Sequence, residues 1–222
     1  CTEKQEEINQ WKNIKDPEPA RAEKVLKNRE NLTALGIPHI PLYKTVDYVE
    51  DLDIETRACI EEAIVDMGLL DALIVPKAFQ EKLKTVTDRG GDKYIFASPQ
   101  FMVHTINQYL RVDPSMADIP KEEVENVLTS ILMDENHHTY MDERGNFRLG
   151  ILRGKTGGGY TPKFIGSTAR KKYREDRLKC LGQELEEIQS RLNQKNLAVQ
   201  LLEDEQKVLK VEYASVPDGT DL

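Results

Sequence analysis

The residues with the clearest chemical potential lie in a glycine-rich run near position 150. The run Gly150-Ile151-Leu152-Arg153-Gly154-Lys155-Thr156 is close to the pattern GxxxxGK[ST] of loops that bind nucleotide phosphates. That pattern requires its first glycine at position 149, which is Leu149, and a helix whose N-terminal amides hold the phosphate. More glycines follow instead, so we interpret the run as a strand that ends in a flexible loop. A small nucleotide-binding enzyme that uses Gly150–Thr156 is the alternative.

Other residue types that could bind metals or act as nucleophiles are poorly placed. His137 and His138 adjoin Asp134 and Glu135, but neighbouring residues on a strand point to opposite faces and cannot easily share one ion. The three cysteines are widely spaced and odd in number, so we expect free thiols rather than a disulfide framework. No Ser, Cys or carboxylate pair is placed as nucleophile and base. We therefore expect no catalytic residue, no metal and no cofactor in this chain.

Charge is distributed unevenly. The segment from Arg144 to Lys179 has eleven basic and two acidic residues, a net charge of +9, in a chain whose net charge is −8. Clustered Lys and Arg bind DNA phosphates regardless of base sequence, because binding releases counterions. The alternative is a solvated helix face. The candidate DNA-binding residues are Lys155, Lys163, Arg170, Lys171, Lys172, Arg174 and Arg177.

These residues adjoin the strongest structural signal, a seam of alternate three- and four-residue spacings from Leu178 to Tyr213. Nine of its eleven positions are apolar, and no proline occurs between Lys163 and Val216. The pattern predicts a coiled-coil arm over 167–214 and a tail over 215–222. Apolar residues at helical spacing predict a partner arm over 1–35, with an elbow at 16–19 because Pro17 and Pro19 disfavour helix.

Residues 36–166 have the composition of a globular domain, which gives an α+β fold class. A small mixed α/β domain at the tip of an intramolecular antiparallel coiled coil buries the seams of both arms most economically. The expected elements are a helix over 55–67, strands over 73–75 and 94–96, a helix with Phe101, Met102, Thr105, Ile106 and Tyr109 as its buried stripe, a helix from Asp118 to Leu132, and a hairpin of 139–141 with 147–152.

The composition excludes several classes of protein. Of the 222 residues, 32% are charged and 6% are aromatic, which argues against a compact single-domain enzyme. No stretch approaches the roughly 18 apolar residues of a membrane-spanning helix, and the first residues do not form a secretory signal. We expect a soluble, cytoplasmic protein with no membrane partner. The missing initial Met and the charged helical start suggest a fragment of a longer chain.

The sequence also resembles a known family. The runs GLLDALIVP (68–76) and FIG-x-x-AR (164–170), with DPEPARAEKVLKNRENLTALGIPHIPLYKTVDY and GILRG, are similar to the central region of JetC subunits. JetC subunits are the MukB/MksB-like structural-maintenance-of-chromosomes (SMC) ATPases of bacterial Wadjet plasmid-defence systems. The resemblance covers about 16–192. It implies the hinge of a condensin-like, DNA-loop-extruding motor associated with nucleoid or plasmid DNA.

The resemblance implies a function without catalysis in this segment. Two copies would form a homodimer through glycine-containing edges, for which the candidates are Gly154, Gly157, Gly158, Gly159 and Tyr160. The ATPase heads would lie outside the chain, and so would the binding sites of the kleisin, winged-helix and nuclease subunits. Weak DNA binding is a further expectation. The alternative within this architecture is the hinge or scaffold of another SMC-like or Rad50-like chromosome-maintenance protein.

Overall fold

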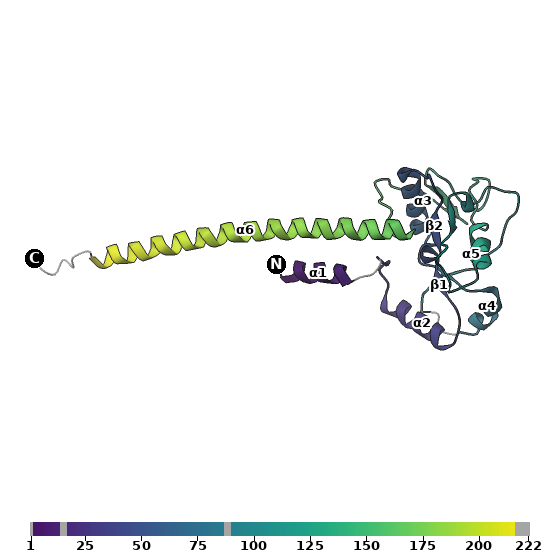
Figure 1. Cartoon of the computed structure of the whole chain (residues 1–222), viewed down its shortest axis with the longest axis horizontal. Coiled ribbons are helices and arrows are strands. Elements are labelled where there is room, and N and C mark those ends of the chain that lie inside the picture. The colour runs from purple at the N-terminus through teal and green to yellow at the C-terminus, as the bar shows by residue number, and fades with distance from the viewer. Residues whose placement is uncertain (1, 14–16, 87–89, 216–222) are drawn as a thin grey trace, which may run out of the picture. The chain divides into compact units, whose positions relative to one another are not determined.

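The computed structural model describes residues 2–13, 17–86 and 90–215 of the chain. It is a mixed α+β structure with a long C-terminal helix (Figure 1). The chain divides into a helical unit, residues 1–15 with 174–222, and a globular unit, residues 16–173. Because the two units are separate bodies, each is described by itself.

The globular unit contains short helices and three small sheets. Its helices are α2 (Glu23–Ala34), α3 (Ile54–Asp66), α4 (Lys77–Lys84), α5 (Lys121–Leu128), the first turns of α6 (Ser167–Ser215) and the 3-10 helices η1 (Leu42–Lys44) and η2 (Ile106–Gln108). Its strands are β1 (Ile40–Pro41), β2 (Val46–Tyr48), β3 (Leu73–Ile74), β4 (Tyr94–Ile95), β5 (Leu110–Val112), β6 (Thr139–Met141), β7 (Asn146–Leu149) and β8 (Leu152–Lys155).

The sheets differ in topology. The first has the order β1-β3-β4, in which β1 and β3 are antiparallel and β3 and β4 are parallel. The second pairs β2 with β5 in antiparallel register, Asp47 opposite Arg111. The third is the antiparallel meander β6-β7-β8, in which Phe147 lies opposite both Met141 and Gly154. The meander extends the predicted hairpin by one strand, because the chain turns back at Gly150 and Ile151.

One hydrophobic core joins these elements. It includes side chains of α3, α5, β2, β3, β6 and β7, among them Ile60, Ile64, Val124 and Met141, each fully or almost fully buried. Helix α3 begins where the Asp53 carboxylate accepts a hydrogen bond of 2.8 Å from the Thr56 amide, and it ends before Gly68, whose φ of +70° suits glycine. These local signals agree with the helix predicted over 55–67.

Helix α2 belongs to the globular unit, which differs from the arm predicted over 1–35. Leu32 is fully buried with Leu73, Val75 and Leu83 in a second hydrophobic cluster. Arg29 of the same helix donates hydrogen bonds to the carboxylates of Asp71 and Asp92. Apolar spacing predicted the helix but did not distinguish a coiled-coil partner from a domain helix. The N-terminal helix of the helical unit is therefore only α1 (Thr2–Asn13).

The helical unit is an antiparallel pair in which α1 lies alongside α6 (Figure 1). Lys4 forms an ion pair with Glu184 at 2.8 Å, and Glu7 forms one with Arg177 at 2.9 Å. As the residue number rises along α1 it falls along α6, which defines the antiparallel register. Leu181 is fully buried in this unit, whereas the seam residues from Ile188 onward are exposed. The predicted elbow at 16–19 lies partly outside the described residues. Pro17 and Pro19 are not helical.

The helix predicted around Phe101–Tyr109 is wrong. Residues 98–105 form an irregular segment followed by the short η2, and Phe101 and Met102 are 80% and 104% exposed rather than buried. The segment runs beside residues 129–133 through backbone hydrogen bonds, including Gln100 N to Thr129 O and Ile106 N to Ile131 O. Pairing of the backbone with this neighbouring segment replaces the helical bonds. Within residues 2–13, 17–86 and 90–215, no helix has the length and apolar character needed to cross a membrane.

The ion pairs of the helical unit predict a pH dependence. Hydrogen bonds from Lys4 and Arg177 hold the pKa of Glu7 below its ordinary value of 4.5, and a hydrogen bond from Lys4 does the same for Glu184. A lowered pKa in the folded state stabilises the α1–α6 contact fully above about pH 4.5, and this contribution is lost as the pH falls through the folded pKa. We expect the fluorescence of Trp11, the single tryptophan, to report separation of α1 as the pH falls below about 4.5.

The control for this titration removes both carboxylates. With Glu7→Gln and Glu184→Gln combined, the acid transition of Trp11 fluorescence should disappear, because no titrating partner of Lys4 remains in the contact. An unchanged transition in that variant would show that other groups cause it.

Candidate functional site

The run Gly150–Thr156 does not have the geometry of a phosphate-binding loop. Gly150, with a φ of +62°, and Ile151 form the two-residue turn between β7 and β8, and the next residues are strand rather than helix. Positive φ at the first turn position is what a tight hairpin requires. The turn therefore explains Gly150 without a nucleotide, and no helix N-terminus follows the run to hold a phosphate.

The five candidate dimerisation residues have different surroundings. Gly154 lies under the Phe147 ring, so that a Cβ at position 154 would collide with the ring. The Tyr160 hydroxyl donates a hydrogen bond of 2.9 Å to the Glu61 carboxylate. Between them, Gly157, Gly158 and Gly159 are exposed, and the last two have φ values near +78°. Packing within the chain accounts for Gly154 and Tyr160, whereas a dimer contact at 157–159 stays a prediction.

The buried carboxylate of Glu61 binds the segment that follows the glycines at 157–159. Glu61 of α3 is fully buried. Its two oxygens accept hydrogen bonds from the Tyr48 and Tyr160 hydroxyls, both at 2.9 Å, and from three successive backbone amides. These amides are Lys163 N at 2.8 Å, Phe164 N at 3.0 Å and Ile165 N at 3.0 Å. Five donors on one carboxylate compensate for its loss of hydration and fix the path of residues 160–165.

The two tyrosines show the electrostatic effect of this site. The pKa of the Tyr48 hydroxyl and that of the Tyr160 hydroxyl are raised above their ordinary value of 10.0, first by burial and then by the negative charge of Glu61. Both hydroxyls therefore stay protonated and donate to Glu61 throughout the physiological pH range. Nothing in the sequence distinguished Glu61 from its neighbour Glu62, because burial of one acidic residue in α3 depends on the distant segment 160–165.

Four of the seven candidate DNA-binding residues interact with other groups of the same chain. Arg170 is only 7% exposed and donates a hydrogen bond of 3.0 Å to the Phe164 carbonyl. Arg174 donates to the Trp11 and Lys12 carbonyls, and Arg177 pairs with Glu7. The Lys163 ammonium lies 5.2 to 5.7 Å from the ring centres of Tyr160, Phe164 and Tyr173, in cation–π contact.

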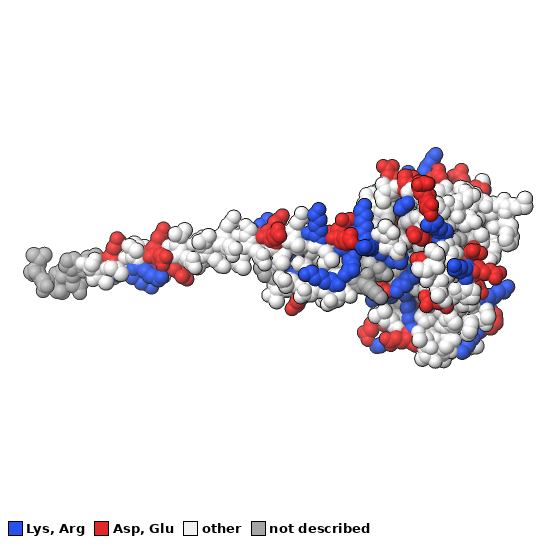
Figure 2. Space-filling view, in the orientation of Figure 1, with Lys and Arg blue, Asp and Glu red and all other residues white. Residues whose placement is uncertain are grey.

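The remaining three candidates, Lys155, Lys171 and Lys172, are exposed. On the visible face of the globular unit, Figure 2 shows acidic and basic side chains mixed with one another rather than separated into patches. Several of the basic side chains in the sequence segment 144–179 are thus bound to other groups of the same chain. DNA binding by these three lysines stays a prediction.

Metal-binding and nucleophilic groups do not converge in the part of the chain that the structure describes. No group of three or more His, Cys, Asp or Glu side chains there could hold a metal ion. His137 lies 3.8 Å from the Asp134 carboxylate, in a turn before β6. Cys59 is half-buried on α3, and Cys180 is exposed on α6.

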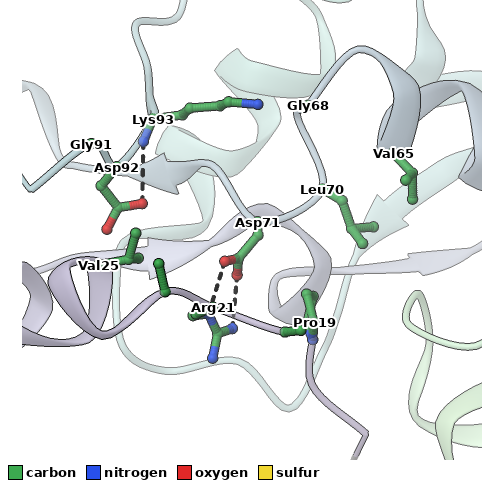
Figure 3. Close-up of a pocket in the computed structure, with 12 residues that line it drawn as sticks. Pro19, Arg21, Val25, Val65, Gly68, Leu70, Asp71, Gly91, Asp92 and Lys93 are labelled. Carbon is green, nitrogen blue, oxygen red and sulfur yellow. Dashed lines mark hydrogen bonds and ion pairs between the residues drawn. The ribbon is translucent and has the colours of Figure 1, made fainter.

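A pocket of about 290 Å³ lies between the start of α2 and the residues that come just before β3 and β4 (Figure 3). The Arg21 guanidinium crosses it and makes two hydrogen bonds, of 2.8 and 2.7 Å, to the Asp71 carboxylate. Lys93 extends toward Gly68, at the C-terminal end of α3, where a helix dipole favours a cation. The charged groups that line the pocket therefore fasten α2 and the preceding segment to the first sheet.

Comparison with protein-family models, with curated proteins and with solved structures found no match. A function for this chain is therefore inferred from its own residues and from the resemblance described for its sequence.

The buried carboxylate generates a test of how residues 160–165 are held. Glu61→Gln places an amide NH₂ group, which donates, against donors that need an acceptor, and we expect a loss of about 3 kcal/mol in the free energy of unfolding. Urea denaturation followed by the near-ultraviolet circular dichroism of the tyrosines measures it. Glu62→Gln is the matched control, because Glu62 accepts one hydrogen bond, from Gly157 N at 3.2 Å, and should change stability by less than about 0.5 kcal/mol. Equal effects of the two variants would contradict the role of Glu61.

Proposed function

We propose that this chain is the hinge, with adjoining coiled-coil arms, of a JetC-type SMC-like protein, and that it acts as the homodimerisation joint of a DNA-loop-extruding complex in bacterial plasmid defence. The observation that carries the proposal is the antiparallel contact of α1 with α6. These two helices flank the globular unit in sequence, with residues 16–173 between them. In this architecture the function is mechanical, and the segment itself catalyses no reaction.

The distribution of apolar residues along α6 supports the arm assignment. Beyond Glu184, which forms an ion pair with Lys4 of α1, seam residues such as Leu192, Leu202 and Leu209 are 47% to 65% exposed. A single helix in water does not stabilise such a seam, whereas a second helix covers it. The proposal assigns this length of α6 to an antiparallel coiled coil that continues in line with α1.

The globular unit contains buried hydrogen bonds of the kind that a mechanical joint requires. In its part of α6, Arg170 is buried and hydrogen-bonded to the Phe164 carbonyl, and the preceding residues are held on Glu61. A pulling force on the start of α6 therefore acts on buried, charge-assisted hydrogen bonds. Such bonds resist separation better than exposed ion pairs do. Force on the chain would therefore enter the globular unit at this start of α6.

Mass in solution tests the proposal. Light scattering at protein concentrations from about 1 to 100 μM, near the micromolar affinities of many specific interfaces, should give a mass near twice 25.4 kDa. The dimer should form without nucleotide, because the proposed segment contains no ATPase. A mass of 25.4 kDa over the whole range, or a dimer that appears only when ATP is added, would contradict the homodimerisation joint.

A further inference from the structure

The loop Phe101-Met102-Val103 presents apolar side chains to solvent. These residues are 80%, 104% and 41% exposed, and Phe96, at the end of β4, is 51% exposed. Large apolar side chains exposed singly are ordinary, but three in succession at a loop tip are not. Sequence periodicity placed Phe101 and Met102 in the core, so their exposure leaves them without the partner that their chemistry favours.

The loop is held at both of its ends. Before the tip, Gln100 N donates to Thr129 O at 3.0 Å, and after it Met133 N donates to His104 O at 2.9 Å. Met102 has a φ of +61°, which is an uncommon and strained conformation for a residue with a side chain. A strained tip between two fixed ends is preorganised, so binding through it pays little conformational entropy.

The charge around the loop indicates which kind of partner fits. Residues 94–110 form the longest run without Asp, Glu, Lys or Arg, 17 positions in a chain of which 32% is charged. The exposed side chains of this run therefore offer no charge to DNA phosphates or to an acidic or basic protein. In a two-fold contact the residues at the symmetry axis lie beside their own copies, where like charges repel. For a chain with a net charge of −8, a neutral apolar surface is where two copies meet at the least electrostatic cost.

We propose that Phe101, Met102 and Val103, with Phe96 five residues before them in sequence, are the anchors through which two copies of this chain join. This inference rests on the proposed function as a homodimerisation joint, and it relocates the contact from the glycine loop 154–160 to residues 96–103. Aromatic residues and methionine are enriched at the buried centres of protein interfaces, and a few such anchors carry most of the binding energy. The rest of the interface excludes water around them.

Replacing the anchor residues and measuring the dissociation constant of the dimer tests this location. In the full chain, Phe101→Ser combined with Met102→Ser should raise the dissociation constant of the dimer by at least about 100-fold, as loss of interface anchors does. Sedimentation equilibrium measures it. Met102→Gly alone should also weaken the dimer by about tenfold. Because glycine suits a positive φ, this variant should keep or raise the stability of the fold, so its weaker dimer cannot be attributed to unfolding.

Ile151→Ser is the matched control. Ile151 is 103% exposed at the tip of the β7–β8 hairpin, close in sequence to the glycine loop. It should leave the dissociation constant unchanged. The dimer should also respond little to salt between about 50 and 500 mM, since screening acts on charges and the anchor residues carry none.

The outcomes separate the two proposals. A wild-type chain that stays monomeric overturns the homodimerisation joint itself, and this inference with it. A wild-type dimer that keeps its affinity in Phe101→Ser with Met102→Ser, or that is lost in Ile151→Ser instead, overturns only the location at residues 96–103. A dimer that weakens in both loop variants and survives Ile151→Ser supports both.

Discussion

The fully buried carboxylate of Glu61 is the interaction on which the globular unit depends. It lies on α3, in the middle of the core, and gathers donors from β2 and from residues 160–165. A carboxylate in such a place would cost several kcal/mol if any large part of its hydrogen bonding were missing. The segment that leads from the meander to α6 therefore has one favourable path. Arg170, which donates to the Phe164 carbonyl, fixes the first turns of α6 on that path.

Much of the helical framework could be predicted from sequence because its signals are local. The seam of α6, the absence of proline within it, and the cap and glycine around α3 each act over a few residues. The antiparallel pairing of α1 with α6 followed from the need to bury two seams. The extent of the first arm could not be predicted in this way. The apolar stripe of α2 has the same spacing whether it faces another helix or, as Leu32 does, a sheet and α4.

The candidate site was harder to predict because it depends on contacts between distant residues. A count of basic residues over 144–179 could not reveal that Arg170 is buried or that Arg174 and Arg177 bind α1. The same limit applies to Glu61, whose neighbour in sequence is also glutamate but points elsewhere. The prediction that Phe101 and Met102 are buried was wrong because a local pattern was misleading. Helical spacing of apolar residues normally means burial. At this position, backbone pairing with residues 129–133 overrides the spacing.

The basic and the uncharged parts of the globular unit favour different kinds of contact. Strand β8 is an edge of the meander and carries Arg153 and Lys155, whose charges would face one another if two copies of this edge paired. Lysine and arginine on an edge strand are a common means of preventing such pairing. The charges of β8 therefore disfavour the pairing of two β8 edges, whereas a dimer contact at 157–159 stays a prediction of the resemblance to SMC hinges. The uncharged loop at 101–103 has no such penalty, and its exposed apolar side chains supply a driving force that the basic edge lacks.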